Sequence, residues 1–354
     1  MSKKTNSSSP TLKDVAAAAG TSLATASRVL SSSDYPVSKD LKQKILNAAG
    51  ELHYTPNMLA RMLKSNVYHV IGVIVPTLQN PFFNQVILGI EAVANRCGYE
   101  IMIFSSHRSI DQERNNINSL LQSRVMALII ISIDTDRSTL QNYMSCGGKV
   151  ALLESNFKLN NAIVTETDHY GAGQLAVEHL AENGHKRIAF LTAPLTKTYR
   201  RTILLGVRET LKEYGFPFSD EDVIEASGEK ETETGLYEFE LGKQLVDLFL
   251  GQENKYSAII AINDLTAFGI IQALTQHGIS VPEDISVISF DNIVYSEMIS
   301  PPLTTIELPS SNMGSTICSM LISSLTNSDQ DLTDVVFRFQ GHLVERKSVA
   351  RPKK

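Results

Sequence analysis

A stretch of twenty residues near the start of the chain, TLKDVAAAAGTSLATASRVL, constrains the fold more than any other. Its Thr11 and Asp14 have the spacing of a capping box, which starts a helix. Gly20 can end that helix, because glycine adopts a positive φ without steric cost. Ser22 can then cap a second helix that runs to Leu30. The sequence therefore predicts two short helices joined by a tight turn.

The second of these helices should have one apolar and one polar face. We expect Ala26 and Val29 to pack on the first helix and Arg28 to face outward. A helix-turn-helix places the first residues of its second helix in the major groove, where an arginine can bond guanine O6 and N7 together. An ordinary helical hairpin with a solvated arginine would have the same pattern, so both alternatives stay open on these residues alone.

The stretch resembles the opening of the lactose-repressor (LacI/GalR) family of bacterial transcription regulators, T-x-x-D-V-A-x-x-A-G-x-S-x-x-T-x-S-R-V-L. The chain departs from the family mildly at Ala26, where valine or threonine is usual. The resemblance implies a helix-turn-helix domain at 11–55. The polar composition of residues 1–10 predicts a disordered tail in front of it. The DNA-binding residues that the resemblance implies are Thr11, Leu12, Ser22, Leu23, Ala24, Thr25, Ser27, Arg28, Ser38, Tyr54, Asn57, Ala60 and Leu63.

A third helix and a short linker follow the pair. Ser38 can cap a helix that ends near Leu52. Residues 56–66 then place apolar groups on a short helix that has no core of its own, and one or two turns of helix are unstable alone. In the resembled family this hinge folds when two subunits meet on DNA, and a leucine at the position of Leu63 wedges into the minor groove. A plain linker is the alternative.

The charge of the chain is divided unevenly. Residues 1–64 hold nine lysines and arginines against four acids, a net charge of +5. Since the whole chain carries −6, the remainder carries −11. A basic head on an acidic body is expected when only the head contacts nucleic acid. No apolar run is long enough for a membrane span, and the start does not read as a signal peptide. We therefore expect a cytoplasmic protein whose three cysteines are buried free thiols.

From residue 67 onward, buried strands alternate with helices, which predicts a doubly wound parallel sheet. The series restarts near Ala162–Val164, and the resemblance matches this to the periplasmic-binding-protein fold, an effector-binding domain at 67–346 with two lobes and three crossings between them. We expect the first lobe at about 67–164 and 294–323, the second at about 165–291 and 324–346, and a tail at 347–354. Pro301–Ile306 is expected to be a crossing, and Val335–Arg346 to supply strands to the second lobe.

Ligands on such sheets bind beyond the carboxyl ends of the strands, and a few directed polar groups suit a small polar ligand. The candidate effector residues there, supported by the resemblance for the last three, are Phe82, Phe83, Glu154, Arg201, Asn263 and Asp291. Asn263 and Asp291 could instead cap helices, and for Asp168 and Asp264 capping is favoured. Sugar-binding relatives often have an aspartate, sometimes followed by an arginine, where this chain has Glu154. Lys197 and Arg200 near the mouth would admit a phosphate or carboxylate.

Enzymatic chemistry has little support in the sequence. Gly171–Ala176 imitates a dinucleotide-binding motif, but it is separated from its strand and no acid ends the next strand. No metal-ligand spacing or nucleophile elbow occurs, so no cofactor and no metal are expected. We predict a ligand-responsive repressor, a homodimer on near-palindromic operator DNA, with a sugar, sugar phosphate or nucleoside as effector. The alternative is a solute-binding protein without a regulatory role.

Overall fold

The computed structural model describes residues 10–30, 36–54, 70–154, 159–228, 236–252, 256–326 and 336–353. The chain forms two compact units, Met1–Tyr68 and His69–Lys354. Three of the predicted DNA-binding residues, Asn57, Ala60 and Leu63, lie outside the described residues. The hinge therefore stays a prediction.

The first unit contains three helices, α1 (Leu12–Ala18), α2 (Leu23–Leu30) and α3 (Lys39–Glu51), which begin and end where the sequence predicts. Thr11 and Asp14 form the expected capping box, and Gly20 leaves the first helix with φ +64°. The core is small because it is built from small residues. Val15 and Ala26 are fully buried at the crossing of α1 and α2, and Ile45 of α3 closes it.

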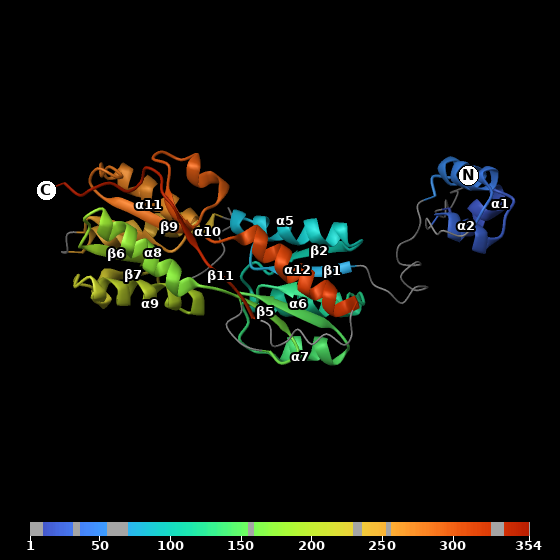
Figure 1. The fold of residues 1–354 in the computed structure, drawn as a ribbon, viewed down its shortest axis with the longest axis horizontal. Helices are drawn as coiled ribbons and strands as arrows, with labels where there is room; N and C mark the ends of the chain where they lie inside the picture. Colours follow the sequence, from blue (N-terminus) through green and yellow to red (C-terminus); the bar gives the residue numbers. More distant parts are fainter. Residues whose placement is uncertain are drawn as a thin grey trace, which may run out of the picture. The chain divides into compact units, whose positions relative to one another are not determined.

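The second unit has two lobes, each built on a sheet of six strands (Figure 1). The sheet of the first lobe has the order β11-β5-β4-β3-β1-β2, and all its neighbours are parallel. Its elements are β1 (Val70–Val75), α5 (Pro81–Arg96), β2 (Glu100–Ser105), α6 (Ile110–Gln122), β3 (Ala127–Ile130), α7 (Ser138–Ser145), β4 (Lys149–Leu153), β5 (Ile163–Thr167), α12 (Ser310–Thr326) and β11 (Val336–Phe339).

The second lobe repeats this plan with the order β12-β10-β9-β8-β6-β7, in which only β12 runs antiparallel to its neighbour. Its elements are α8 (His169–Glu182), β6 (Ile188–Thr192), α9 (Thr198–Glu213), β7 (Val223–Glu225), α10 (Tyr237–Leu250), β8 (Ala258–Ala261), α11 (Asp264–Gln276), β9 (Ser286–Asp291), β10 (Thr304–Glu307) and β12 (His342–Val344). Short 3-10 turns lie at Asp220–Asp222 and Val294–Glu297. A second lobe therefore follows, as expected, but it begins later than the restart near Ala162–Val164, because the strand there, β5, still belongs to the first sheet.

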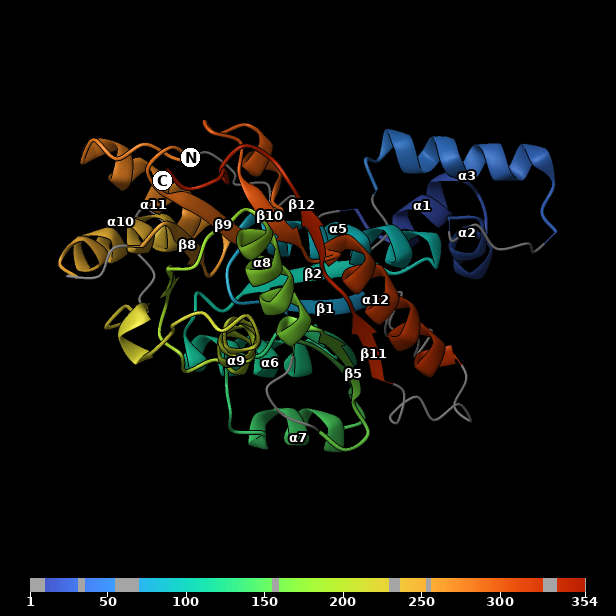
Figure 2. The ribbon, with the colours of Figure 1, turned by 60° about the vertical axis from the view of Figure 1, so that its left-hand side comes forward.

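The chain crosses between the lobes after β5, after β10 and between β11 and β12. Figure 2 shows β11 and β12 following one another from one lobe to the other. One expectation was wrong, because Thr304–Glu307 belongs to the second sheet and the return crossing follows it at Leu308. Another was right only in part: of the two late strands expected in the second lobe, His342–Val344 joins its sheet, whereas Val336–Phe339 pairs with β5 of the first sheet. The lobe boundaries shift accordingly, because a short strand does not indicate by its own pattern which sheet edge it will join.

Reciprocal glycines bring three pairs of helices into close contact. A Cβ at Gly173 of α8 would lie 2.3 Å from the Ile203 carbonyl oxygen of α9, and one at Gly206 of α9 would lie 2.2 Å from the Tyr170 oxygen. The pairs α5–α12 and α10–α11 cross in the same way, at Gly89 with Gly314 and Gly242 with Gly269. The glycines of the imitated dinucleotide motif thus lie inside α8, as expected, and Gly173 allows its close approach to α9.

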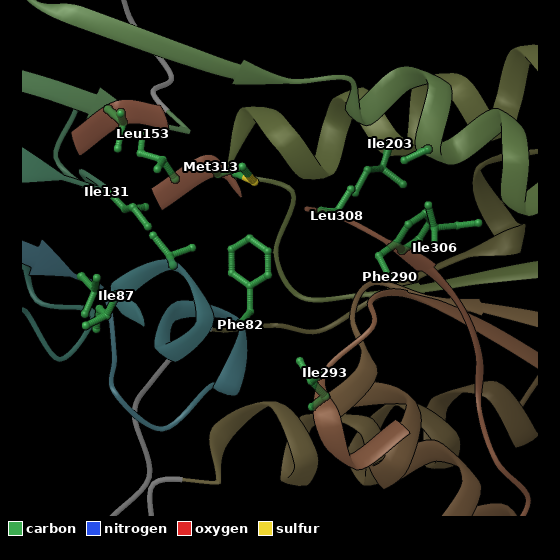
Figure 3. Close-up of a cluster of buried hydrophobic side chains, with 14 of the residues drawn as sticks. Phe82, Ile87, Ile131, Leu153, Ile203, Phe290, Ile293, Ile306, Leu308 and Met313 are labelled. Atoms are coloured by element: carbon green, nitrogen blue, oxygen red, sulfur yellow. The ribbon is translucent and has the colours of Figure 1, made fainter. Parts of the chain in front are cut away.

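The apolar core extends from one lobe into the other at the floor of the cleft. Figure 3 shows the Phe82 ring between first-lobe side chains such as Met313 and second-lobe side chains such as Phe290, with Leu308 of the crossing segment nearby. The cysteine expectation was wrong in part: all three are free thiols, but Cys97 and Cys146 are exposed. Among the described helices, none has the length and apolar character needed to cross a membrane.

Candidate functional site

The outward face of α2 is a candidate DNA-reading surface. Arg28, Ala24 and Leu23 are exposed there, with Leu23 retaining 45% of its accessible surface. The Ser22 hydroxyl accepts the Thr25 N–H at 3.1 Å and so caps the helix, as predicted. Burial of Ala26 and Val29 against the rest of the unit fixes which face turns outward. This is the geometry that a recognition helix needs.

Other predicted DNA-binding residues cap helices or pack in the core of the first unit. Thr11 bonds the Asp14 carboxylate with its N–H at 2.8 Å and its hydroxyl at 2.7 Å, and these bonds lower the pKa of Asp14. Ser38 caps α3 through the Leu41 N–H at 3.4 Å. Tyr54 packs against the headpiece core, and so does Leu12. These positions therefore shape the surface, whether or not they also touch DNA.

A cavity of about 170 Å³ lies in the second unit, between the two lobes. Its wall includes residues at the carboxyl ends of the central strands, where a ligand is expected from the sequence. Of the six predicted effector residues, the structure brings five together in its wall: Phe82, Phe83, Glu154, Asn263 and Asp291. The two phenylalanine rings meet edge to face, with their centroids 5.5 Å apart.

The structure places the sixth, Arg201, outside the pocket wall. Its guanidinium is exposed and donates to the carbonyl oxygens of Leu195 at 2.7 Å and Thr196 at 2.9 Å, outside the pocket. The neighbouring Arg200 lines the pocket instead, with only 4% of its surface exposed. It donates to the Pro194 oxygen at 2.8 Å and to the Tyr199 hydroxyl at 3.0 Å. Adjacent residues of a helix point about 100° apart, so a single step in register exchanges the two roles.

Asn263 and Asp264 also differ from expectation in part. Asn263 caps α11 by accepting the Thr266 N–H at 2.9 Å, and it lines the pocket as well. Asp264, predicted to be a cap, is instead a fully buried acceptor within the second lobe. It accepts from four groups, the hydroxyls of Ser289, Ser296 (2.5 Å) and Thr305 (2.6 Å) and the Ile293 N–H (2.9 Å). Burial raises the pKa of Asp264, although these four hydrogen bonds act to lower it. Asp168 caps α8, as predicted.

Asp291 ends β9 in a strained turn. Its φ is +109° and that of Asn292 is +52°, and two successive non-glycine residues rarely adopt positive φ without support from their surroundings. Asn292 is held by Glu307 at 2.6 Å and Arg346 at 2.7 Å. Burial, then the nearby charges of Asp264 and two glutamates, raise the pKa of Asp291 well above its usual range. A carboxyl group of raised pKa can keep its proton and donate to a polar ligand.

Glu154 also adopts positive φ, +58°, at the end of β4. Its carboxylate accepts from the Thr167 hydroxyl and, at 2.5 Å, from Nε2 of His169. Burial alone would raise the pKa of Glu154, but His169 and Thr167 outweigh it and lower the pKa. The Glu154–His169 contact joins the first lobe to the start of α8 in the second. Within the second lobe, the centroid of the His169 ring lies 5.6 Å from that of the Tyr199 ring.

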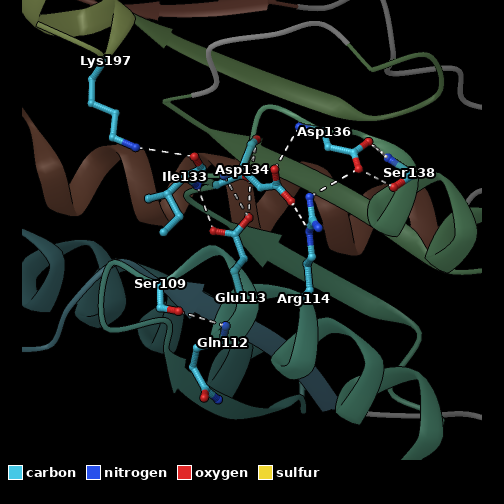
Figure 4. A network of polar contacts seen from close by, with 10 residues as sticks. Ser109, Gln112, Glu113, Arg114, Ile133, Asp134, Asp136, Ser138 and Lys197 are labelled. Carbon is cyan, nitrogen blue, oxygen red and sulfur yellow. Dashed lines mark hydrogen bonds and ion pairs between the residues drawn. The ribbon is translucent and has the colours of Figure 1, made fainter.

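Several side chains of the pocket have no signal of their own in the sequence. Arg108 and Asn80 of the first lobe meet Glu238 of the second, 130 and 158 residues away. Figure 4 shows a further network, in which Glu113 of α6 accepts the Ile133 N–H at 2.8 Å and the Ser132 hydroxyl at 2.5 Å. Residues that pair across such long distances in the chain leave no periodic pattern in the sequence. Within the described residues, no group of three or more potential ligands for a metal ion comes together.

Two family models match the chain. One, for the periplasmic binding proteins and sugar binding domain of the LacI family, covers residues 68–339, and the other, for bacterial regulatory proteins of the lacI family, covers residues 11–57. The HTH-type transcriptional repressor PurR of Haemophilus influenzae (strain PittEE) is 32% identical over 90% of this chain and 92% of its own. The ribose operon repressor of Escherichia coli (strain K12) is 32% identical over 89% and 93%.

Solved structures agree with the sequence comparisons. The lac repressor dimer bound to operator and the anti-inducer ONPF aligns with a TM-score of 0.77 at 25% identity, over 97% of this chain and all of the other. A LacI family regulator from Enterococcus faecium with bound ribose aligns with a TM-score of 0.70 at 26% identity, over 80% of this chain and all of the other. The similarity therefore spans both the helical unit and the two lobes.

Proposed function

The chain belongs to the LacI family of bacterial transcription regulators, and from this premise we propose that a small polar effector in the cleft controls its binding to operator DNA. The protein is a DNA-binding regulator rather than an enzyme, since its relatives are transcriptional repressors. One observation carries the proposal: a helix-turn-helix and a lined inter-lobe pocket occur on the same chain. A solute-binding protein without a regulatory role would have no use for the exposed α2.

We infer that the effector is the size of a monosaccharide. The cavity of about 170 Å³ is smaller than the roughly 300–1,000 Å³ of pockets for drug-sized ligands. Aromatic rings at Phe82 and Phe83 offer an apolar wall, and Asp291 offers a carboxyl group for hydroxyls. Lys197 and Arg200 in the same wall suit a phosphate or carboxylate substituent. This favours a sugar or sugar phosphate over the bulkier nucleoside, and a relative with bound ribose supports it.

A homodimer is the proposed assembly, in the cytoplasm where operator DNA is found. Strand β2 lies at the edge of its sheet and exposes Met102 (39%) and Ile103 (41%), where a parallel sheet is ordinarily covered. Leu88 of α5 and Ile110 of α6 are also exposed, at 52% and 43%. A second copy of the chain would cover such an edge. Two-fold symmetry would then make the operator near-palindromic.

The DNA-binding part of the proposal is tested by selecting sites from a randomised duplex library and measuring affinity by fluorescence anisotropy. Arg28→Ala should cost about 1–3 kcal/mol on the selected site and relax the preference at one base pair. Lys42→Ala, which removes an exposed charge of α3, is the matched control and should leave the order of preference unchanged. Unchanged selectivity in Arg28→Ala would refute the role of α2.

The effector is sought by thermal shift with ribose, ribose 5-phosphate and adenosine. A ligand at 100 times its Kd adds about 2.7 kcal/mol to the stability of the folded state. Asp291→Asn should weaken that shift, whereas Asp284→Asn, which changes an exposed carboxylate outside the pocket wall, should retain it. A full shift in Asp291→Asn would remove Asp291 from the effector site.

A further inference from the structure

Three side chains from two lobes meet in one wall of the pocket. Arg108 comes from the turn between β2 and α6, Asn80 from the start of α5, and Glu238 from the first turn of α10. The Arg108 guanidinium forms an ion pair with the Glu238 carboxylate, and Asn80 Nδ2 donates to the same carboxylate oxygen at 3.4 Å. The charged side chains are only 12% and 8% exposed. A pair this well buried is poorly screened by solvent.

The surroundings of Arg108 aim it at the second lobe. His107 and Arg108 have φ of +49° and +56°, a costly conformation for two successive non-glycine residues. The Arg108 N–H donates to the Pro76 oxygen at 3.0 Å, which holds this turn. The guanidinium also lies over the Tyr237 ring, 5.2 Å from its centroid. One first-lobe side chain is thus held by two consecutive residues of α10.

A second link crosses the cleft through the loop after β3. Lys197, just before α9, donates from Nζ to the Ile133 carbonyl oxygen at 3.4 Å. Figure 4 shows that this loop is itself held from below by Glu113 and from the side by Arg114, which bonds Asp134 at 2.6 Å. Together with the Glu154–His169 contact, the protein therefore joins its lobes with its own groups at three places in the pocket wall.

We propose that Glu238 is a positioning residue that holds the cleft closed by drawing Arg108 and Asn80 onto α10. The inference rests on the proposed effector cleft, and it says how that cleft is regulated. This contact raises the population of the closed arrangement. A ligand that binds the closed arrangement preferentially therefore spends less of its binding free energy on closing the cleft. Removing one partner leaves the other charge buried and unpaired, which favours an opening that lets water reach it.

The test measures the distance between the lobes by pulsed electron paramagnetic resonance. One spin label is placed on exposed Asn115 of α6 and one on exposed Gln244 of α10, each changed to cysteine. Cys97→Ser and Cys146→Ser remove the exposed native thiols, and labelled chain is diluted with unlabelled chain to suppress distances between subunits. Glu238→Gln and Arg108→Gln should each shift the distance distribution to longer values.

The exchanged variant Arg108→Glu with Glu238→Arg should return the distribution toward that of the wild type. Glu240→Gln is the matched control, because Glu240 lies on the same helix but pairs with Lys243 of that helix at 3.1 Å. Unchanged distances in both single variants, or the same shift in Glu240→Gln, would overturn the proposal. An exchanged variant that stays open would do so too.

Folding of each variant is checked by far-ultraviolet circular dichroism. If the single variants do not fold, Arg108→Lys decides, because lysine keeps the charge but loses the planar guanidinium that lies over the Tyr237 ring. Distances between the labels that are longer than in the wild type support the proposed role of the Arg108–Glu238 contact, and unchanged distances refute it. The measurement needs neither DNA nor effector, so its failure is distinguishable from a failure of the proposed function.

Discussion

Loss of the Asp264 carboxylate should destabilise the second unit strongly and free the turn that carries Asp291. Asp264 is fully buried and accepts four hydrogen bonds, from β9, β10 and the residues between them. In Asp264→Ala the three hydroxyls can rotate to other acceptors, but the Ile293 N–H cannot. An orphaned buried group costs about 1–3 kcal/mol, and the lost carboxyl packing adds to it. We expect a loss of about 2–4 kcal/mol.

The measurement is urea unfolding followed by circular dichroism, because the chain has no tryptophan. Asp264→Asn keeps the shape but presents an amide NH₂ to four donors, so a similar loss is expected. Asp284→Asn is the control, because that carboxylate is exposed and bonds Lys353 at 2.7 Å on the surface. A loss below about 1 kcal/mol in both Asp264 variants would refute the view that this carboxylate organises the turn.

Two further predictions follow from the same structure. Gly206→Ala places a Cβ 2.2 Å from the Tyr170 oxygen, and the cost of overpacking, about 1–3 kcal/mol, should exceed the gain in helix propensity of about 1 kcal/mol. Gly251→Ala meets only ordinary contacts and should leave the thermal unfolding nearly unchanged, so equal effects of the two substitutions would contradict the prediction. Glu154→Gln tests the lowered pKa of Glu154. The wild type should be more stable than the variant by a constant amount above the ordinary pKa of 4.5, and this difference should vanish as pH falls through the lowered pKa of the folded state. A difference in stability that does not depend on pH would refute the pairing.

Much of the fold could be predicted because each element has local signals. Thr11, Ser22 and Ser38 cap the helices that their spacing indicated, since capping involves residues only three apart. Buried parallel strands are continuous apolar runs, so Val70–Val75 and Ala258–Ala261 are recognisable without tertiary information. The pocket followed in turn, because the carboxyl ends of parallel strands meet at one edge.

The failures share a cause, which is that the deciding information is not local. Arg200 and Arg201 both fall in the first turn of α9, where the face toward the cleft depends on how α9 crosses α8 at Gly206. Asp264 looks like a cap because it starts a helix, yet its partners lie 25 to 41 residues further along. The strand Val336–Phe339 could pair with either sheet, and only tertiary packing assigns it to β5.

Buried carboxylates appear where a pocket loop must be rigid. In the first lobe, Glu113 of α6 binds backbone N–H groups of the loop after β3, the strand that follows its helix. In the second lobe, Asp264 of α11 does the same for the turn after β9, again the strand that follows its helix. Burial raises the pKa of both carboxyls, and the hydrogen bonds that each accepts oppose this shift. Rigid loops of this kind allow a small ligand to change the spacing of the lobes instead of deforming its own pocket, which is what control at a distance requires.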